Sequence, residues 1–309
     1  MYPARDLYTL VVPPEHEFES GVGSGIVLIH GLTGFMDAGA GGRLAVKHIL
    51  DTLENRPVAY FHIDNLYDYR ARRPKTVFDS DHFESMELPH LTLSEVTDAE
   101  GQKFLLLHGV EPDLGWQSVV RSVIELIRTY GVRLTVGIHA IPWPAPHTRP
   151  LEITAHSSDP ELLGLHQPWV GQVEIPGSVA SLIEINLGQQ QLPAVGYAAH
   201  VPHYLANSEY PRAALALLDQ LALSTGLMIP RDDLRQAAVE IDADIDKQIA
   251  SIAENRDVVE SLEQQHDDVM RSRNELTATP EGNLVSGEDL AAALEEYLAN
   301  LDEKDRDSN

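Results

Sequence analysis

The sequence predicts an α/β protein with three layers: a mostly parallel sheet, covered on both faces by helices, and a C-terminal helical extension after it. Three observations predict this fold. Five short runs are almost continuously apolar, as expected for parallel strands that are buried on both faces. Helical segments lie between many of these runs. From Tyr210 onward the chain shows helical periodicity only. The 309 residues, 43% of them hydrophobic, suffice for one large α/β domain with a smaller appendage.

The first predicted strand is GIVLIHG and the last is PAVGYAAHV. The helices between the strands are expected where apolar residues recur three or four positions apart. The predicted strands are 25–31, 57–63, 103–109, 133–141 and 193–201, and the predicted helices between them are 42–55, 116–130 and 178–187. We expect the α/β domain to cover residues 1–230.

The rest of the chain is expected to be helical and then irregular. In 231–273, apolar residues recur at spacings of three, four or seven, which is a heptad-like stripe. We expect a helical hairpin or coiled coil with a break near AENRD, or one amphipathic helix lying on the domain. Residues 274–309 are predicted to form a linker, a short helix capped by Ser286 and Asp289, and a disordered acidic tail. The stripe consists of Leu234, Ala238, Ile241, Ile245, Ile249, Ile252, Val259, Leu262 and Val269.

Charge and composition exclude several classes of function. The chain has 22 basic and 48 acidic residues, a net charge of −26, which disfavours nucleic acids and anionic membranes as partners. It has no cysteine, so disulfides, thiolate metal sites and cysteine nucleophiles are excluded. No apolar run approaches the ~20 residues of a membrane span, and no signal peptide is recognisable. These features predict a cytoplasmic protein.

The loop GFMDAGAGG leads from the first strand onto a helix N-terminus, a place where anions can bind. It lacks the lysine of a Walker loop and the spacing of a dinucleotide fingerprint, and no G-x-S-x-G motif occurs anywhere in the chain. Its glycines predict a close approach to a ligand, a helix or a subunit. Asp37 could cap the helix, act as an acid or metal-binding group, or order the loop by pairing with Arg70. We favour the pairing.

Each predicted strand carries a histidine at or near its carboxyl end, and parallel strands share that edge, where ligands bind. The alternative is that each histidine caps its own strand. No spacing is specific for a metal, and we predict neither a metal nor a cofactor. We expect His30, Asp37, His62, Arg70, Glu111 and His139 to line one concavity. The full candidate set is His30, Gly34, Asp37, Gly39, His62, Arg70, His108, Glu111, Pro112, Asp113, His139, His147 and His200.

The loop GFMDAGAGG also resembles the G-[WF]-x-D-A-G signature of the proteasome assembly chaperone 2 family. YDYRARRP, LLLHGVEPDLGW, IPWPAPHTRP and GLMIP resemble that family in the same order, over roughly 28–246. The helical extension resembles the longer actinobacterial members. The resemblance implies a fold like that of nucleoside phosphorylases and related hydrolases, often in oligomers. It implies no settled enzyme activity. The chain ends DRDSN and lacks the hydrophobic-tyrosine-X tail by which some members dock on proteasomes. The positions that carry over are Gly34, Asp37, Gly39, Arg70, Glu111 and Pro112.

Two functions are weighed. The first is a protein-binding or assembly factor with a partner related to the proteasome. It is favoured by the resemblance and by the absence of a complete catalytic motif. The second is a hydrolase or phosphorylase of nucleoside-like substrates, with Asp37, Arg70 and Glu111 as acid, anion clamp and base. A regulatory ligand-binding protein is a third class. We also expect a homo-oligomer, first a trimer and then a dimer, because the isoleucines of the stripe need an apolar partner surface.

Overall fold

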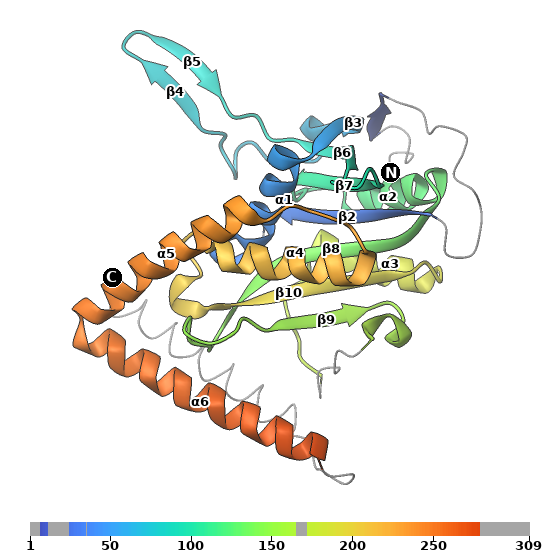
Figure 1. Cartoon of the computed structure of the whole chain (residues 1–309). Helices are drawn as coiled ribbons and strands as arrows, with labels where there is room; N and C mark the ends of the chain where they lie inside the picture. The colour runs from blue at the N-terminus through green and yellow to red at the C-terminus, as the bar shows by residue number, and fades with distance from the viewer. Residues whose placement is uncertain (1–6, 12–24, 35, 165–171, 279–309) are drawn as a thin grey trace.

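The computed structural model describes residues 7–11, 25–34, 36–164 and 172–278 (Figure 1). Its centre is an eight-stranded sheet with the order β1-β3-β6-β7-β2-β8-β10-β9, and β4 and β5 form a separate hairpin. The strands are β1 (Tyr8–Leu10), β2 (Ile26–Thr33), β3 (Glu54–Phe61), β4 (Thr76–Asp79), β5 (His82–Met86), β6 (Leu91–Thr97), β7 (Lys103–Val110), β8 (Val132–Trp143), β9 (Ile153–Ser157) and β10 (Ala194–Pro202).

The sheet is mixed, with a parallel centre. Neighbouring β7, β2, β8 and β10 run parallel. β3 points the same way, because both β3 and β7 pair antiparallel with β6 between them. These five strands are the five that the sequence predicts. The antiparallel β1, β6 and β9 were not predicted, and β6 lies between β3 and β7.

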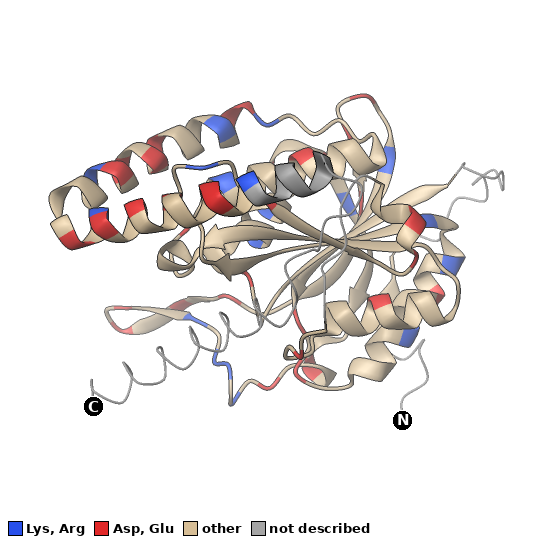
Figure 2. Ribbon diagram, turned by 90° about the horizontal axis from the view of Figure 1, so that it is seen from below, with Lys and Arg blue, Asp and Glu red and all other residues tan. Residues whose placement is uncertain are grey.

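Helices cover both faces of the sheet, and Figure 2 shows them on either side of the strands. The helices are α1 (Gly41–Thr52), α2 (Trp116–Thr129), α3 (Val179–Gln189), α4 (Pro211–Thr225), α5 (Asp232–Ser251) and α6 (Ala253–Ala278). Alternate residues of β2 enter different cores: Val27 and Ile29 pack with α1 and α4, whereas Ile26 and Leu28 pack with α2 and α3. Burial on both faces explains why the central strands are almost continuously apolar.

Helices α5 and α6 form a hairpin, here called the arm, that turns at Ile252 (Figure 1). Much of the heptad-like stripe packs within the chain itself: Ile245 is buried, and Ile241 and Ile249 pack against the core that contains α1 and α4, whereas Ile252 and Val269 are 46% and 52% exposed. Three of the four isoleucines on which the expected oligomer rests therefore find apolar contacts within the described part of the chain, and Ile252 does not. The arm also extends further than predicted, because α6 runs to Ala278 through the start of the predicted linker. The predicted cap at Ser286 and the acidic tail lie outside the described residues.

Among the helices that the structure describes, none is long and apolar enough to cross a membrane.

Candidate functional site

The candidate site lies where the five strands of common direction end. The five predicted histidines do not meet there as one group. His30, His139 and His200 alternate with residues of the first core, so they face the side of the sheet that α2 and α3 cover. His108 faces the other side, where its Nε2 lies 3.0 Å from Ser94 Oγ. His62 is exposed just after β3, with its Nε2 2.8 Å from Thr9 Oγ1.

A histidine cluster, defined as His30, His139 and His156, lies across one face of the sheet. Gly137 and Gly196 are paired between β8 and β10 and form its floor. A Cβ at Gly137 would stand 2.8 Å from the His30 ring, and a Cβ at Gly196 would stand 2.0 Å from the His156 ring. These rings fit only because both floor positions are glycine. The rings of His139 and His156 are 6.1 Å apart.

The buried members of this cluster are poor bases. Burial, followed by the neighbouring His139 and His156, lowers the pKa of His30 to about 4. Burial, followed by His156, also lowers the pKa of His139 to about 4. Both rings are therefore neutral at pH 7 and would resist becoming general acids. His156 differs, because its side chain is 44% exposed and its Nδ1 lies 2.8 Å from Glu184 on α3.

Asp37 closes the N-terminus of α1. Its two carboxylate oxygens accept hydrogen bonds from the backbone amides of Gly42 at 2.7 Å and Arg43 at 2.8 Å. Burial raises the pKa of Asp37, and these hydrogen bonds oppose the rise. The anion position that a glycine-rich loop offers is thus filled by the chain's own carboxylate, as helix capping requires. The favoured pairing of Asp37 with Arg70 is wrong.

The glycines of this loop serve close packing. Gly39 has φ +62° and lies against Tyr210 and Val201, so a side chain there would be strained and crowded. A Cβ at Gly41 would crowd the side chains of Ala140 and Ala213, so this position also requires glycine. The loop thus allows α1 to approach β8 and α4 closely. Of the roles expected for its glycines, the structure shows close packing against a helix rather than against a ligand.

We predict that Asp37→Ala will cost about 1–2 kcal/mol of unfolding free energy, because two amides at the start of α1 lose their acceptor. Asp37→Asn should cost less, since its carbonyl oxygen can still accept one hydrogen bond. Urea unfolding measures both. In a double-mutant cycle, Asp37→Asn and Arg70→Gln should be additive, because the two side chains do not interact. A coupling above the error of the cycle would restore the pairing.

Glu111 joins three elements at the end of the sheet. Its Oε1 accepts a hydrogen bond of 2.6 Å from the amide of Val179 at the start of α3. Its own amide donates to Thr33 of β2 at 2.7 Å. A Cβ at Gly34 would stand 2.6 Å from Glu111 Oε2, which explains the glycine there. Glu111 caps α3, so its carboxylate is not free to act as a base. Pro112, next to it, is buried and accepts a hydrogen bond from Trp116.

Arg72, rather than Arg70, is the arginine of the site. Its guanidinium pairs with Asp113 at 2.8 Å, donates to the carbonyl of Glu111 at 2.7 Å and lies 4.5 Å from the ring centre of Tyr67. Arg70 is exposed, and within the described part of the chain its guanidinium makes no ion pair. The sequence motif YDYRARRP placed an arginine here but did not distinguish which one turns inward.

The loop after β8 connects the site to the arm. His147 is buried, with Nδ1 2.7 Å from the Tyr204 hydroxyl and Nε2 3.1 Å from Asp246 of α5. Arg149 pairs with Asp267 at 2.8 Å and with Glu263 at 3.3 Å, both on α6. His147 therefore belongs to the contact between this loop and the arm and lies apart from the histidine cluster.

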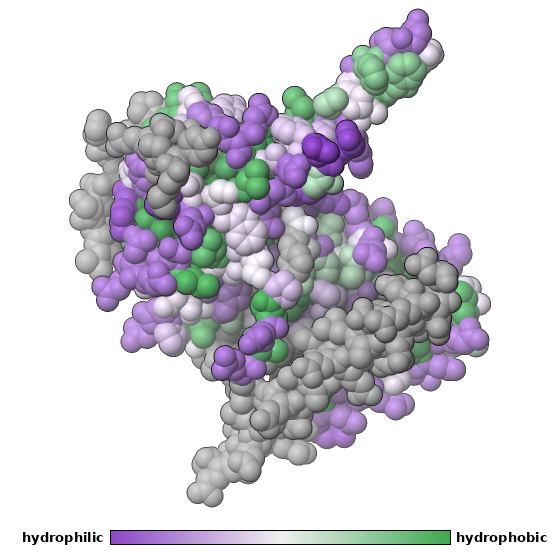
Figure 3. Space-filling model, turned by 180° about the vertical axis from the view of Figure 1, so that it is seen from behind, coloured by the Kyte–Doolittle hydropathy of each residue, from purple (hydrophilic) through white to green (hydrophobic). Residues whose placement is uncertain are grey.

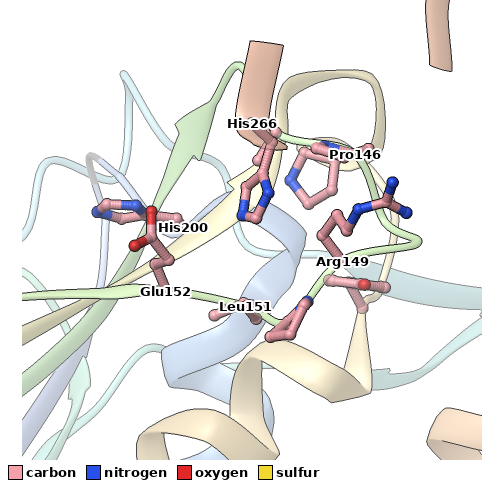
Figure 4. A pocket seen from close by; sticks show the side chains of 10 residues that line it. Pro146, Arg149, Leu151, Glu152, His200 and His266 are labelled. Carbon is pink, nitrogen blue, oxygen red and sulfur yellow. The ribbon is translucent and has the colours of Figure 1, made fainter. Parts of the chain in front are cut away.

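A small cavity lies between this loop, the end of β10 and α6. Figure 4 shows Glu152 and His200 on one side of it and Arg149 and His266 on the other. The ring of His200 stacks on Trp143 at 4.1 Å. The cavity volume is about 10 Å³, enough for one water, whereas pockets for small ligands usually measure hundreds of Å³. An open hollow of about 560 Å³ lies at the start of α2, beside Leu114, Trp116 and Arg121.

The structure thus divides the candidate residues among several places. His30 and His139 share the histidine cluster, Asp37 caps α1 on the opposite face, and His62 and Arg70 are exposed, so the expected single concavity is not formed. His156 and Glu184 were missed, because their strand and helix carry no recognisable site motif. Among the described residues, no group of three or more histidine, aspartate or glutamate side chains is arranged to hold a metal.

Comparison with known proteins identifies relatives of the whole fold. The model of the PAC2 family matches residues 31–249. A Mycobacterium tuberculosis protein of unknown function is 42% identical, with a TM-score of 0.83 over 87% of this chain and 91% of that one. A Corynebacterium glutamicum protein of unknown function is 35% identical, with a TM-score of 0.80 over 85% and 98%. A Mycobacterium tuberculosis proteasome-assembly chaperone homologue is 24% identical, with a TM-score of 0.68 over 76% and 100%. The search among curated proteins found no match.

Proposed function

The chain belongs to the PAC2 family, and from this premise we propose that it is a protein-binding assembly factor whose partner is related to the proteasome. One structural relative is described as a proteasome-assembly chaperone homologue, and at 24% identity it shares the fold with this chain. In the candidate site, the buried histidines, Asp37 and Glu111 are engaged within the fold. They are therefore not free to act on a small molecule, and this favours a protein as the ligand. A cytoplasmic location is part of this proposal, since such a partner would be met there.

The observation that carries the proposal is the hairpin of β4 and β5, which projects from the body (Figure 1). Every residue of both strands is exposed. Phe78 and Phe83 pair across the hairpin with ring centres 5.2 Å apart, and they are 57% and 75% exposed. Figure 3 shows hydrophobic residues gathered on this projection. An isolated two-stranded hairpin is marginal in water, and an apolar patch on a projecting element is typical of a protein contact.

A direct test uses purified proteasome α-subunits from the organism that encodes the chain. We expect co-elution with the full chain at micromolar concentration, and weaker binding of the Phe78→Ser/Phe83→Ser variant. Leu223→Ser is the matched control, because Leu223 is 81% exposed on α4, away from the hairpin. If the α-subunits and the full chain elute separately, the proteasome-related partner is excluded.

We further predict a homo-oligomer, with a trimer first and a dimer second, held in part by the hairpin. Light scattering should give about three times the chain mass of 34.1 kDa. Phe78→Ser/Phe83→Ser should lower the mass, whereas Leu223→Ser should not, because burial of two phenylalanines contributes a few kcal/mol to association. A monomer at micromolar concentration would contradict the prediction.

The second candidate function is an enzyme that acts on nucleoside-like substrates. The open hollow at the start of α2 supports it, because Trp116 and Arg121 there could contact a base and an anion. Trp116 also provides the readout. A nucleoside with phosphate should change its fluorescence in a saturable way, and Trp116→Phe should remove the change. No saturable change at millimolar nucleoside would leave the assembly factor as the only proposal.

A further inference from the structure

The stretch 68–75, which leads into the hairpin, is held in one conformation by its own hydrogen bonds. The amide of Asp68 donates to the Asp113 carboxylate at 2.7 Å. The Asp68 carboxylate accepts from the amides of Arg70 at 2.9 Å and Ala71 at 3.2 Å. Together with the inward Arg72, these bonds fix the turn. A fixed turn presents its outward side chains at little further cost in entropy.

Three of the five exposed residues of this stretch are cationic, and the other two are Ala71 and Asp68, whose carboxylate accepts the two hydrogen bonds given above. Arg70, Arg73 and Lys75 are exposed, and we call them the basic segment. Among the arginines and lysines with described side chains, only five form neither an ion pair nor a side-chain hydrogen bond: Arg70, Arg73, Lys75, Lys247 and Arg256. Three of these five stand within six residues. In a chain with a net charge of −26, such a concentration of unpaired cations marks a surface for an acidic partner.

We propose that the C-terminal segment 279–309 of the same chain is this partner and binds the basic segment. It contains nine acidic and two basic residues, a net charge of 2 − 9 = −7. The description of the chain ends at Ala278, so 309 − 278 = 31 residues follow it. At ~3.3 Å per residue they span up to about 100 Å, whereas a folded chain of this length has a radius of gyration of about 19 Å. The segment can therefore reach the basic segment from the end of the arm.

The same-chain segment fits better than a free acidic ligand. Exposed ion pairs are individually weak, but a tethered segment is present at an effective concentration of about millimolar. Nucleic acid, the other common ligand of clustered arginines, is repelled by the acidic remainder of the chain, whose Asp and Glu residues recur along the arm (Figure 2).

Zero-length cross-linking of the full chain with a carbodiimide tests the proposal, because Lys75 supplies an amine and the segment supplies carboxylates. Peptide mass spectrometry should find cross-links from Lys75 to residues 279–309 in about fivefold excess over those from Lys247. Lys247 is the matched control, an exposed lysine of α5 that also lacks an ion pair. The excess should fall at about 0.5 M salt, where charges further apart than a few Å are screened. Equal yields from the two lysines would overturn the proposal.

Two further experiments complete the test. Arg70→Glu/Arg73→Glu keeps Lys75 as the reporter and changes only exposed side chains, so the fold is preserved. The variant should lose most of the Lys75 cross-links, and an unchanged yield would overturn the proposal. Mixing light and ¹⁵N-labelled chains identifies the source of the segment. Cross-links within a single isotope are expected, whereas mixed-isotope pairs would overturn the assignment to the same chain.

Discussion

Lowering the pH from 7 to 5 is expected to destabilise the protein by about 2 kcal/mol for each histidine that the fold keeps neutral. Three of the described histidines show this behaviour most strongly. The pKa values of His30, His108 and His139 are each lowered to about 4, chiefly by burial. An unfolded histidine titrates near 6.5, so the unfolded chain takes up protons at pH 5 that the folded chain excludes. This stability is fully present above about pH 6.5 and is lost as the pH falls toward 4.

His30 is the sharpest place to test this expectation. It is 5% exposed and lies above Gly137, so its ring has no room to turn toward solvent. His30→Gln should lower the stability at pH 7 and should also reduce the loss between pH 7 and pH 5 by about 2 kcal/mol. Urea unfolding at a series of pH values measures both quantities. His82→Gln on the hairpin is the control, because the His82 side chain is 64% exposed.

The comparison between variants matters more than the total pH dependence. Protonation of carboxylates between pH 7 and pH 5 reduces the self-repulsion of a chain with a net charge of −26, and this opposes the effect of the histidines. The opposing contribution is common to the wild-type chain and both variants, so it cancels in their difference. If His30→Gln and His82→Gln show the same pH dependence as the wild type, the neutral buried state of His30 is refuted.

The central part of the fold could be predicted because double burial leaves a direct trace in the sequence. β2, β3, β7, β8 and β10 are apolar runs, and all five were expected. β6 alternates more, with threonine and serine in LTLSEVT, and pairs antiparallel between β3 and β7. The hairpin of β4 and β5 has no buried face at all, so no periodicity could reveal it. The arm was expected, but periodicity could not show that much of its stripe packs on the chain's own core.

The candidate site was less predictable, because side-chain direction depends on register. A shift of one position in a strand moves a histidine to the other face, and this separates His108 from His30. Arg70 and Arg72 both belong to the predicted motif, yet only Arg72 lies where Asp113 and the Glu111 carbonyl can bind it. The role of Asp37, in contrast, could be foreseen as one of three alternatives, because its place in the loop just before a helix suggested that it caps this helix. Contacts close in sequence could be foreseen, whereas those set by sheet register could not.

Gly109→Ala is expected to be the most destabilising single substitution that we propose, at about 3–5 kcal/mol. Gly109 has φ +121°, which L side chains rarely adopt. A Cβ there would stand 2.0 Å from the carbonyl oxygen of His90. That oxygen accepts a hydrogen bond of 2.8 Å from the amide of Val110, so it cannot move without breaking the end of the β6–β7 ladder. Backbone strain and a backbone clash therefore coincide at one position.

The same pair of strands offers a control that separates the two causes. Gly101 lies in the turn between β6 and β7 with φ +86°, but a Cβ there would meet nothing within 4 Å. Gly101→Ala should cost only the strain, about 1 kcal/mol. The difference between the two variants in urea unfolding then measures the clash with His90.

Hydrogen exchange provides a second measurement. Because Gly109 immediately precedes Val110 and Glu111, the damage should spread to the cap of α3. Exchange at the Val179 amide should therefore accelerate in Gly109→Ala but not in Gly101→Ala. Equal losses in the two variants would show that strain alone acts at Gly109 and that the end of β6 yields to an added methyl group.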